Sequence, residues 1–437
     1  MSRLKSLIVI TLLIVSSVCV AAEENQSTLL IHAGTLLSIP GEAPALQQSI
    51  IVRGNRIESV VDGYIDPDSL TGEVQLIDLS DKFVLPGLID MHVHLLGEIS
   101  PESRSNALYL STSMEAMRGV YYAGITLNAG FTTVRDLGST PEAIYALRYA
   151  INQGLVDGPT IFAAGSALAA TGGHGDVDGY SAELMKLWTP ETICDGPIEC
   201  RAATRSAIKF GADWIKITAT GGVLSDTNTG LGQQMTDDEL IEIVATAHNL
   251  GIKVAAHAHG ADGINAALRA GVDSIDHGTY LNEESIALFK QTGAYLVPTL
   301  LPGVKIPESM EGNPFYTDAI KLKANAAGAA AAENIGNAYR NGVNIAFGTD
   351  SAVTPHGLNG EEFGLMVRVG FSEMDAIYSA TIGAATLLSQ MAEIGTIEAG
   401  KKADIIATDN SPLDDITELE HVDIVIKGGK LIKSINH

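Results

Sequence analysis

Short apolar runs rich in β-branched residues alternate with amphipathic segments through the middle of the chain. This alternation is typical of parallel β/α units, in which a helix follows and covers each strand. The runs that we expect to be strands are residues 83–94, 132–136, 160–164, 214–218, 253–257, 274–277, 295–298 and 345–350. About eight parallel strands close a TIM barrel. The sequence therefore predicts an α/β fold with a (β/α)8 barrel over residues 85–395.

One helix between these strands can be delimited at both ends. Thr236 and Glu239 form the sequence pattern of a capping box, and apolar residues follow at helical spacing from Leu240 to Ala247. Gly251 then supplies a stop before the next apolar run. We expect a helix that begins after Thr236 and ends near residue 249.

The two flanks of the chain have a different pattern. Residues 23–84 contain short strand-like pieces separated by turns, and residues 396–437 repeat that style. Neither flank alone has enough apolar residues to cover both faces of a sheet. We therefore expect the two flanks to meet as one small β-sandwich beside the barrel.

The first residues have the order of a secretory signal peptide. Arg3 and Lys5 precede the apolar run 7–20, and small residues end at Ala22. The run is short for a bilayer span, although a retained anchor is the alternative. We expect residues 1–22 to be removed, which predicts an exported protein, periplasmic or secreted, without stable membrane insertion.

Cleavage after Ala22 would leave two cysteines, Cys194 and Cys200, on either side of a Gly-Pro turn. In an oxidising compartment such close cysteines favour a local disulfide. The formal net charge of −25 makes nucleic acid an unfavourable partner.

The strongest chemical signal is Asp90-Met-His92-Val-His94 at the end of an apolar run. Residues two apart on a strand point to the same side, so both imidazoles would face one pocket. At the carboxyl end of a barrel strand, such a pocket is where barrel enzymes place their active sites. Alone, however, the two histidines are as consistent with a structural pair as with a metal site.

Further metal-capable side chains end other expected strands. His257, His277 and Asp350 each follow an apolar run, and a barrel would make them converge. Lys216 lies among apolar residues, where burial opposes its charge. Loss of that charge and conversion to a metal ligand would resolve the conflict.

The sequence here resembles the amidohydrolase superfamily over essentially all of the chain after residue 22. The motifs are the residues from Val84 to His94, Lys216, His257, His277, Gly348-Thr-Asp350 and Gly400-Lys-Lys-Ala-Asp404. In binuclear members the lysine is carboxylated by carbon dioxide and the carbamate bridges two metals. By this resemblance, His92, His94 and Asp350 would hold one metal, His257 and His277 the other, and Lys216 would bridge them. Imidazole and carboxylate ligands suit zinc best.

Within the superfamily, the chain is similar to the branch grouped with imidazolonepropionase, which includes exported Xaa-Pro dipeptidases and Xaa-Arg/Lys carboxypeptidases. The pieces that carry this likeness include Thr171-Gly-Gly-His174-Gly and Ala256-His257-Ala-His259-Gly260. Imidazolonepropionases themselves use one metal, so Lys216 argues against that identity.

The resemblance implies roles for the remaining histidines. His174 would polarise the carbonyl of the substrate, and Asp350 would move the proton from water to the departing amine. His259 could contact substrate or support a metal ligand, and His356 could contact substrate or be a structural loop residue.

The resulting expectation is a binuclear zinc amidohydrolase that cleaves dipeptides or short, N-acylated peptides and releases a C-terminal amino acid. The alternative is a hydrolase of a non-peptide amide or lactam, such as an aryl amide. A metal-storing protein would need the ligands but not His174 or a substrate pocket. The sequence is compatible with a homo-oligomer and does not specify one.

Overall fold

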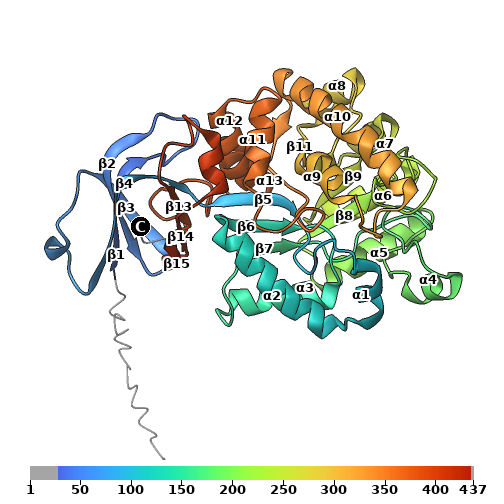
Figure 1. Ribbon diagram of the computed structural model, residues 1–437, viewed down its shortest axis with the longest axis horizontal. Helices are drawn as coiled ribbons and strands as arrows, with labels where there is room; N and C mark the ends of the chain where they lie inside the picture. The colour runs from blue at the N-terminus through green and yellow to red at the C-terminus, as the bar shows by residue number, and fades with distance from the viewer. Residues whose placement is uncertain (1–27, 435–437) are drawn as a thin grey trace, which may run out of the picture.

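A computed structural model describes residues 28–434 of the chain, and the predicted signal peptide lies outside this range. Figure 1 shows a sheet built from both ends of the chain on one side and parallel strands surrounded by helices on the other. Within the described range, no helix is long and apolar enough to cross a bilayer.

The flanks pair into one seven-stranded sheet in the order β15-β14-β13-β4-β1-β2-β3. Its strands are β1 (Thr28–Leu36), β2 (Ala45–Arg53), β3 (Arg56–Asp62), β4 (Val74–Pro86), β13 (Ile405–Thr408), β14 (Ile424–Lys427) and β15 (Lys430–Ser434). β4 joins the two flanks because it pairs parallel with β1 and antiparallel with β13. The expected meeting of the flanks is thus observed as one sheet, and these pairings do not establish a two-sheet sandwich.

Eight parallel strands lie between the flanks and form two ladders. The first sheet has the order β5-β6-β7 and the second β12-β11-β10-β9-β8. The strands are β5 (Leu88–Val93), β6 (Phe131–Asp136), β7 (Thr160–Ala163), β8 (Trp214–Thr218), β9 (Lys253–Ala258), β10 (Ser274–His277), β11 (Tyr295–Val297) and β12 (Asn344–Ile345).

A few backbone hydrogen bonds connect the edges of these two sheets. Leu168, after β7, donates to the carbonyl of Lys216 in β8 at 2.8 Å. At the other edge, Asp350 donates to the carbonyl of His92 in β5 at 2.8 Å. Among the described residues these contacts align the strands, but the ladders do not form one closed barrel.

Two expected strands differ from the observed elements. The run 83–94 is divided at Gly87, where the chain leaves the flank sheet and enters the parallel sheet. A Cβ atom on Gly87 would lie 2.3 Å from the hydroxyl of Thr132, so the crossing requires glycine. The strand expected over 345–350 ends at Ile345, and Asp350 adopts a φ of 57°, which a β-ladder does not accommodate.

Helices surround the parallel strands, as β/α units require (Figure 1). They are α1 (Ser103–Tyr109), α2 (Thr112–Asn128), α3 (Pro141–Asn152), α4 (Ala182–Trp188), α5 (Pro197–Phe210), α6 (Asp237–Asn249), α7 (Ala261–Ala270), α8 (Glu283–Thr292), α9 (Leu301–Ser309), α10 (Asp318–Arg340), α11 (Glu361–Arg368), α12 (Glu373–Tyr378) and α13 (Ala384–Leu387). Short helical turns are η1 (Pro67–Ser69), η2 (Ser379–Gly383) and η3 (Ile416–Glu420). The capping box predicted at Thr236 and Glu239 is present at the start of α6.

Separate apolar clusters stabilise the two regions. The flank sheet packs around buried aliphatic side chains such as Ile31, Ile50 and Ile405. Ile89, Met91 and Val297 belong to a buried cluster that also includes residues of α13. The predicted disulfide between Cys194 and Cys200 is present and ties the segment before α5 to that helix.

Candidate metal centre

The side chains predicted as metal ligands gather where the parallel strands end. His92 lies in β5 and His94 follows it, Lys216 lies in β8, His257 in β9 and His277 at the end of β10. Asp350 belongs to the segment after β12. All of them line one cavity of about 490 Å³. The register of the parallel strands therefore brings together residues that are far apart in the sequence.

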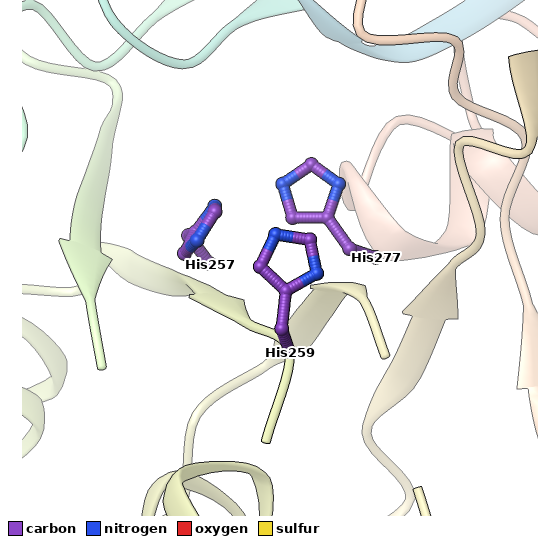
Figure 2. Close-up of side chains that lie close together, drawn as sticks. All are labelled: His257, His259 and His277. Carbon is purple, nitrogen blue, oxygen red and sulfur yellow. The ribbon is translucent and has the colours of Figure 1, made fainter. Parts of the chain in front are cut away.

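Within this cavity, two groups of three side chains have the proximity that a metal ion needs. One consists of His92, His94 and Asp350, and its ligand atoms lie within 4.8 Å of one another. The other consists of His257, His259 and His277, with the same spacing (Figure 2). The second group contains His259 in addition to the two histidines that the sequence singled out as ligands.

Hydrogen bonds orient the rings of the first group. The Nδ1 atom of His94 lies 2.8 Å from the carbonyl oxygen of Gly138, a partner that can only accept. The Nε2 atom lies 3.1 Å from Oδ1 of Asp350, and in a neutral ring protonated at Nδ1 it would be the nitrogen available to a metal ion. The Nε2 atom of His92 lies 3.5 Å from the same oxygen.

Threonine hydroxyls orient two rings of the second group. His259 Nδ1 lies 2.7 Å from the hydroxyl of Thr279, and His277 Nδ1 lies 2.7 Å from that of Thr299. Figure 2 shows the three rings close together, with His257 and His259 rising from one chain segment and His277 from the next strand. Partners of this kind commonly fix the tautomer of a metal-binding histidine.

Burial keeps most of these imidazoles neutral. It lowers the pKa of His92, His257 and His277 well below the usual value. It also lowers the pKa of His259 to about 3. Burial acts in the same direction on His94, but the hydrogen bond and charge of Asp350 outweigh it and raise that pKa. Neutral rings offer lone pairs, so the donor set fits divalent metal ions such as zinc.

Backbone strain accompanies two of the candidate ligands. His277 and Asp350 adopt φ angles of 74° and 57°, in a region that residues other than glycine rarely occupy. Thr299, which holds the His277 ring, has a φ of 47°. Such strain persists where the surrounding structure imposes it, and it is concentrated at functional sites.

Lys216 is buried and forms an ion pair that the sequence analysis did not anticipate. Its Nζ atom lies 2.8 Å from Oδ2 of Asp276, and Oδ1 of Asp276 lies 3.0 Å from the guanidinium of Arg135. Burial lowers the pKa of Lys216, while Asp276 opposes that change. The available signal was the presence of Arg135 and Asp276 in segments expected to be buried strands, where isolated charges are costly.

His174 lies in the cavity beside the second group. Its ring centroid is 4.2 Å from that of His257, and its Nδ1 atom is 2.7 Å from the hydroxyl of Ser225. Burial lowers the pKa of His174 to about 4. The structure therefore brings a neutral histidine next to the candidate ligands, on the wall of the same cavity.

His356 occupies a different environment. It does not line the cavity; its Nε2 atom lies 2.9 Å from the carbonyl oxygen of Gly97, and its ring packs 4.6 Å from that of Tyr122. These contacts favour the structural alternative for His356 over contact with substrate.

The remainder of the cavity is mostly apolar. Its walls include Leu137, Val223 and Leu224, Ile306 of α9, and Ala324, Ala327 and Ala331 of α10. Lys216 is the one lysine or arginine among the lining residues within the described range, and it is already paired with Asp276. The space around the candidate metals is thus suited to an uncharged, apolar group.

The comparisons with known proteins agree with this geometry. The model of the amidohydrolase family matches residues 83–432. The ochratoxinase of Aspergillus niger is 32% identical over 438 residues, which cover 95% of this chain and 88% of that protein. The crystal structure of a Xaa-Pro dipeptidase with methionine in its active site has a TM-score of 0.86 at 41% identity, covering 92% of this chain and 99% of that one.

A more distant relative is the imidazolonepropionase of Fusobacterium nucleatum, 24% identical over 88% of this chain and 91% of that protein. Its presence among the relatives agrees with the branch indicated by the sequence motifs. The family model covers most of the chain, and the ochratoxinase and dipeptidase cover nearly all of it. This chain is a member of the amidohydrolase family.

Proposed function

We propose that the protein is a binuclear metal-dependent hydrolase that cleaves an amide bond in dipeptides or short, N-acylated peptides and releases a C-terminal amino acid. One observation carries this proposal. The two groups of candidate ligands line one cavity, and Lys216 and His174 line the same cavity. A metal-storing protein would not need a cavity of about 490 Å³ beside its ligands.

In this proposal, His92, His94 and Asp350 hold one ion, and His257 and His277 hold the other. His259 is close enough to the second ion to serve as a ligand or to line the substrate side. Lys216, as its carbamate, would serve as a ligand shared by both ions, which we expect to be zinc. Two such ions polarise a carbonyl group and lower the pKa of a water molecule.

The side chains of the protein supply the remaining chemistry. Nδ1 of His174 lies 2.7 Å from the Ser225 hydroxyl, and in the tautomer in which that hydroxyl donates, Nε2 would be an N–H donor for the carbonyl oxygen of the substrate. Asp350 takes the proton from the attacking water and delivers it to the departing amine, which cannot leave as an anion. The backbone of Asp350 is strained, and its carboxylate lies beside the imidazole rings of both His92 and His94.

We further propose that the eight parallel strands correspond to the TIM barrel of this family, and that the flanks form its small β-domain. Residues 1–22 would be a signal peptide that exports the protein to the periplasm or the medium. Intact-mass analysis of protein from the outer compartment tests this directly. A mature start near Glu23 is expected, and a mass that includes residues 1–22 would contradict it.

A second candidate substrate is a non-peptide amide with an apolar or aromatic acyl group. The apolar walls of the cavity and the similarity to an ochratoxinase favour it. Both candidates require the same hydrolytic chemistry and differ only in the acyl group.

The test is a panel of dipeptides, N-acyl amino acids and aryl amides of amino acids, assayed with the protein before and after metal removal. We expect hydrolysis of at least one class, loss on chelation, and recovery with zinc. His257→Asn is expected to lose metal, whereas His248→Asn, on the surface beside Asp273, serves as the matched control and retains it. Full activity of metal-free protein would refute the proposal.

A further inference from the structure

A second cavity, of about 410 Å³, adjoins the candidate metal centre. The two cavities share five lining residues, namely His94, Gly138, Ser139, Thr140 and Val353. The shared residues include the candidate metal ligand His94, so the second cavity lies directly beside the site of cleavage. Residues of α1 and α2 form its far wall.

Arg118 of α2 lines this second cavity and has no carboxylate within 4.0 Å among residues 28–434. Its contacts are with Tyr122, whose hydroxyl lies 3.4 Å from Nη2 and whose ring centre lies 5.7 Å from the guanidinium carbon. Arg104 and Arg135, by contrast, have acidic partners at 3.0 Å. A half-buried guanidinium without an acidic partner is suited to bind a carboxylate through two parallel N–H donors.

Two acidic side chains line the same cavity. Glu115 lies one helical turn before Arg118 on α2, and Glu98 accepts a hydrogen bond from the backbone of His356 at 2.9 Å. The aliphatic side chains of Leu96, Ile99 and Leu110 also line it, together with the polar side chains of Ser103 and Asn106. One cation, two acids and an apolar wall match a molecule that carries a carboxylate, an ammonium group and an apolar side chain.

We propose that the second cavity binds the free α-amino acid released by the reaction, with its carboxylate on Arg118 and its ammonium group facing Glu115 and Glu98. In the hydrolysis, the oxygen of water bonds to the carbonyl carbon, the C–N bond breaks, and the nitrogen takes the proton of water. The amine becomes an ammonium group only after this step. The inference rests on the proposed function, because cleavage creates the charge that the two acids recognise.

Equilibrium binding to the metal-loaded protein tests the proposal without turnover. The probes are L-leucine, L-leucinamide, which lacks the carboxylate, and N-acetyl-L-leucine, which lacks the ammonium group. Arg118→Gln is expected to weaken L-leucine binding by about ten- to hundredfold and to leave L-leucinamide binding unchanged. Glu115→Gln is expected to weaken L-leucine by about two- to fivefold and to leave N-acetyl-L-leucine unchanged.

Two further variants control for folding and charge. Arg118→Lys keeps the positive charge without the planar fork, so its affinity for L-leucine is expected to be intermediate. Arg201→Gln removes an arginine that pairs with Glu242 between α5 and α6 and lines neither cavity, and it is expected to bind all three probes normally.

The proposal is overturned if the wild-type protein does not bind L-leucine, or if Arg118→Gln changes L-leucine and L-leucinamide equally. Its failure can be distinguished from failure of the proposed function. Hydrolysis of the amide panel with unchanged L-leucine binding in Arg118→Gln refutes this inference alone. Binding of L-leucine through Arg118 without hydrolysis of any amide refutes the proposed function alone.

Discussion

Lys216 donates a hydrogen bond of 2.8 Å to Asp276, and both side chains are buried beneath the candidate metal centre. The same carboxylate holds Arg135, whose guanidinium also packs 4.5 Å from the centre of the Trp214 ring. Two buried cations therefore share one anion in the interior. Removing one member of such a pair leaves an uncompensated buried charge.

Asp276→Asn is therefore expected to destabilise the metal-free protein by about 3–5 kcal/mol, as measured by urea unfolding. Arg201→Gln, which breaks an exposed pair with Glu242, is the control and is expected to leave the free energy of unfolding nearly unchanged. A loss below about 1 kcal/mol in Asp276→Asn would show that Asp276 is dispensable for this charge balance.

Lys216→Ala is expected to lose metal and activity, and short carboxylic acids that replace the carbamate are expected to restore part of both. Lys216→Arg is not expected to be rescued, because a permanently charged guanidinium cannot become an anionic ligand. Metal content by elemental analysis and turnover are the two readouts. If Lys216→Arg binds two metals and turns over normally, the lysine has only a structural role.

Asp350→Asn is expected to retain much of the metal while kcat falls by about 10²–10⁴. An amide oxygen can still coordinate, but it cannot accept and return a proton at neutral pH. Asparagine also tolerates the φ of 57° at this position, so the fold is expected to persist. Metal content and kcat are compared with those of His257→Asn, and near-normal kcat in Asp350→Asn would assign the proton transfer to another group.

Gly222→Ala is expected to impair catalysis without unfolding the protein. A Cβ atom at Gly222 would lie 2.1 Å from the ring of His174 and would displace it. Because a misplaced catalytic group can cost about 10² in rate, kcat is the measurement. Gly124→Ala in α2 is the control, since nothing lies within 4 Å of the added atom. It is expected to stabilise the helix by about 1 kcal/mol and to leave kcat unchanged; equal kcat in both variants would exclude the displacement.

Glu362→Gln is expected to change how stability depends on pH. Burial raises the pKa of Glu362 to about 8, although it accepts hydrogen bonds from the backbone of Leu300 and Leu301. The folded protein then keeps a proton that the unfolded chain loses near pH 4.5, so this contribution to stability is complete at lower pH and is lost as the pH rises through about 8.

The unfolding free energy of the wild-type protein is therefore expected to fall relative to that of Glu362→Gln between about pH 5 and pH 8. Denaturant unfolding across that range measures the difference. The control is Glu361→Gln, at the neighbouring residue, whose carboxylate pairs with Lys305 at 2.8 Å. The pH dependence of its unfolding free energy is expected to match that of the wild type. Parallel curves for Glu362→Gln and the wild type would mean that Glu362 has an ordinary pKa.

Local patterns in the sequence were sufficient to predict many of the strands and helices. The strands 214–218 and 274–277 and the helix that follows Thr236 are observed at the predicted residues, because each is defined by its own apolar spacing and caps. The prediction of a strand over residues 345–350 was wrong beyond Ile345, where the observed strand ends. There the backbone is dictated by the position that Asp350 takes beside His92 and His94, which is a long-range constraint.

The sequence by itself identified the candidate ligands His92, His94, His257, His277 and Asp350, because each follows an apolar run and parallel strands align their carboxyl ends. Only the tertiary structure decided which of them share a site. It grouped His259 with His257 and His277, placed Asp276 between Lys216 and Arg135, and moved His356 away from the cavity. The reason is physical: periodicity along the chain specifies the face on which a residue lies, whereas distances between faces depend on how strands and helices pack.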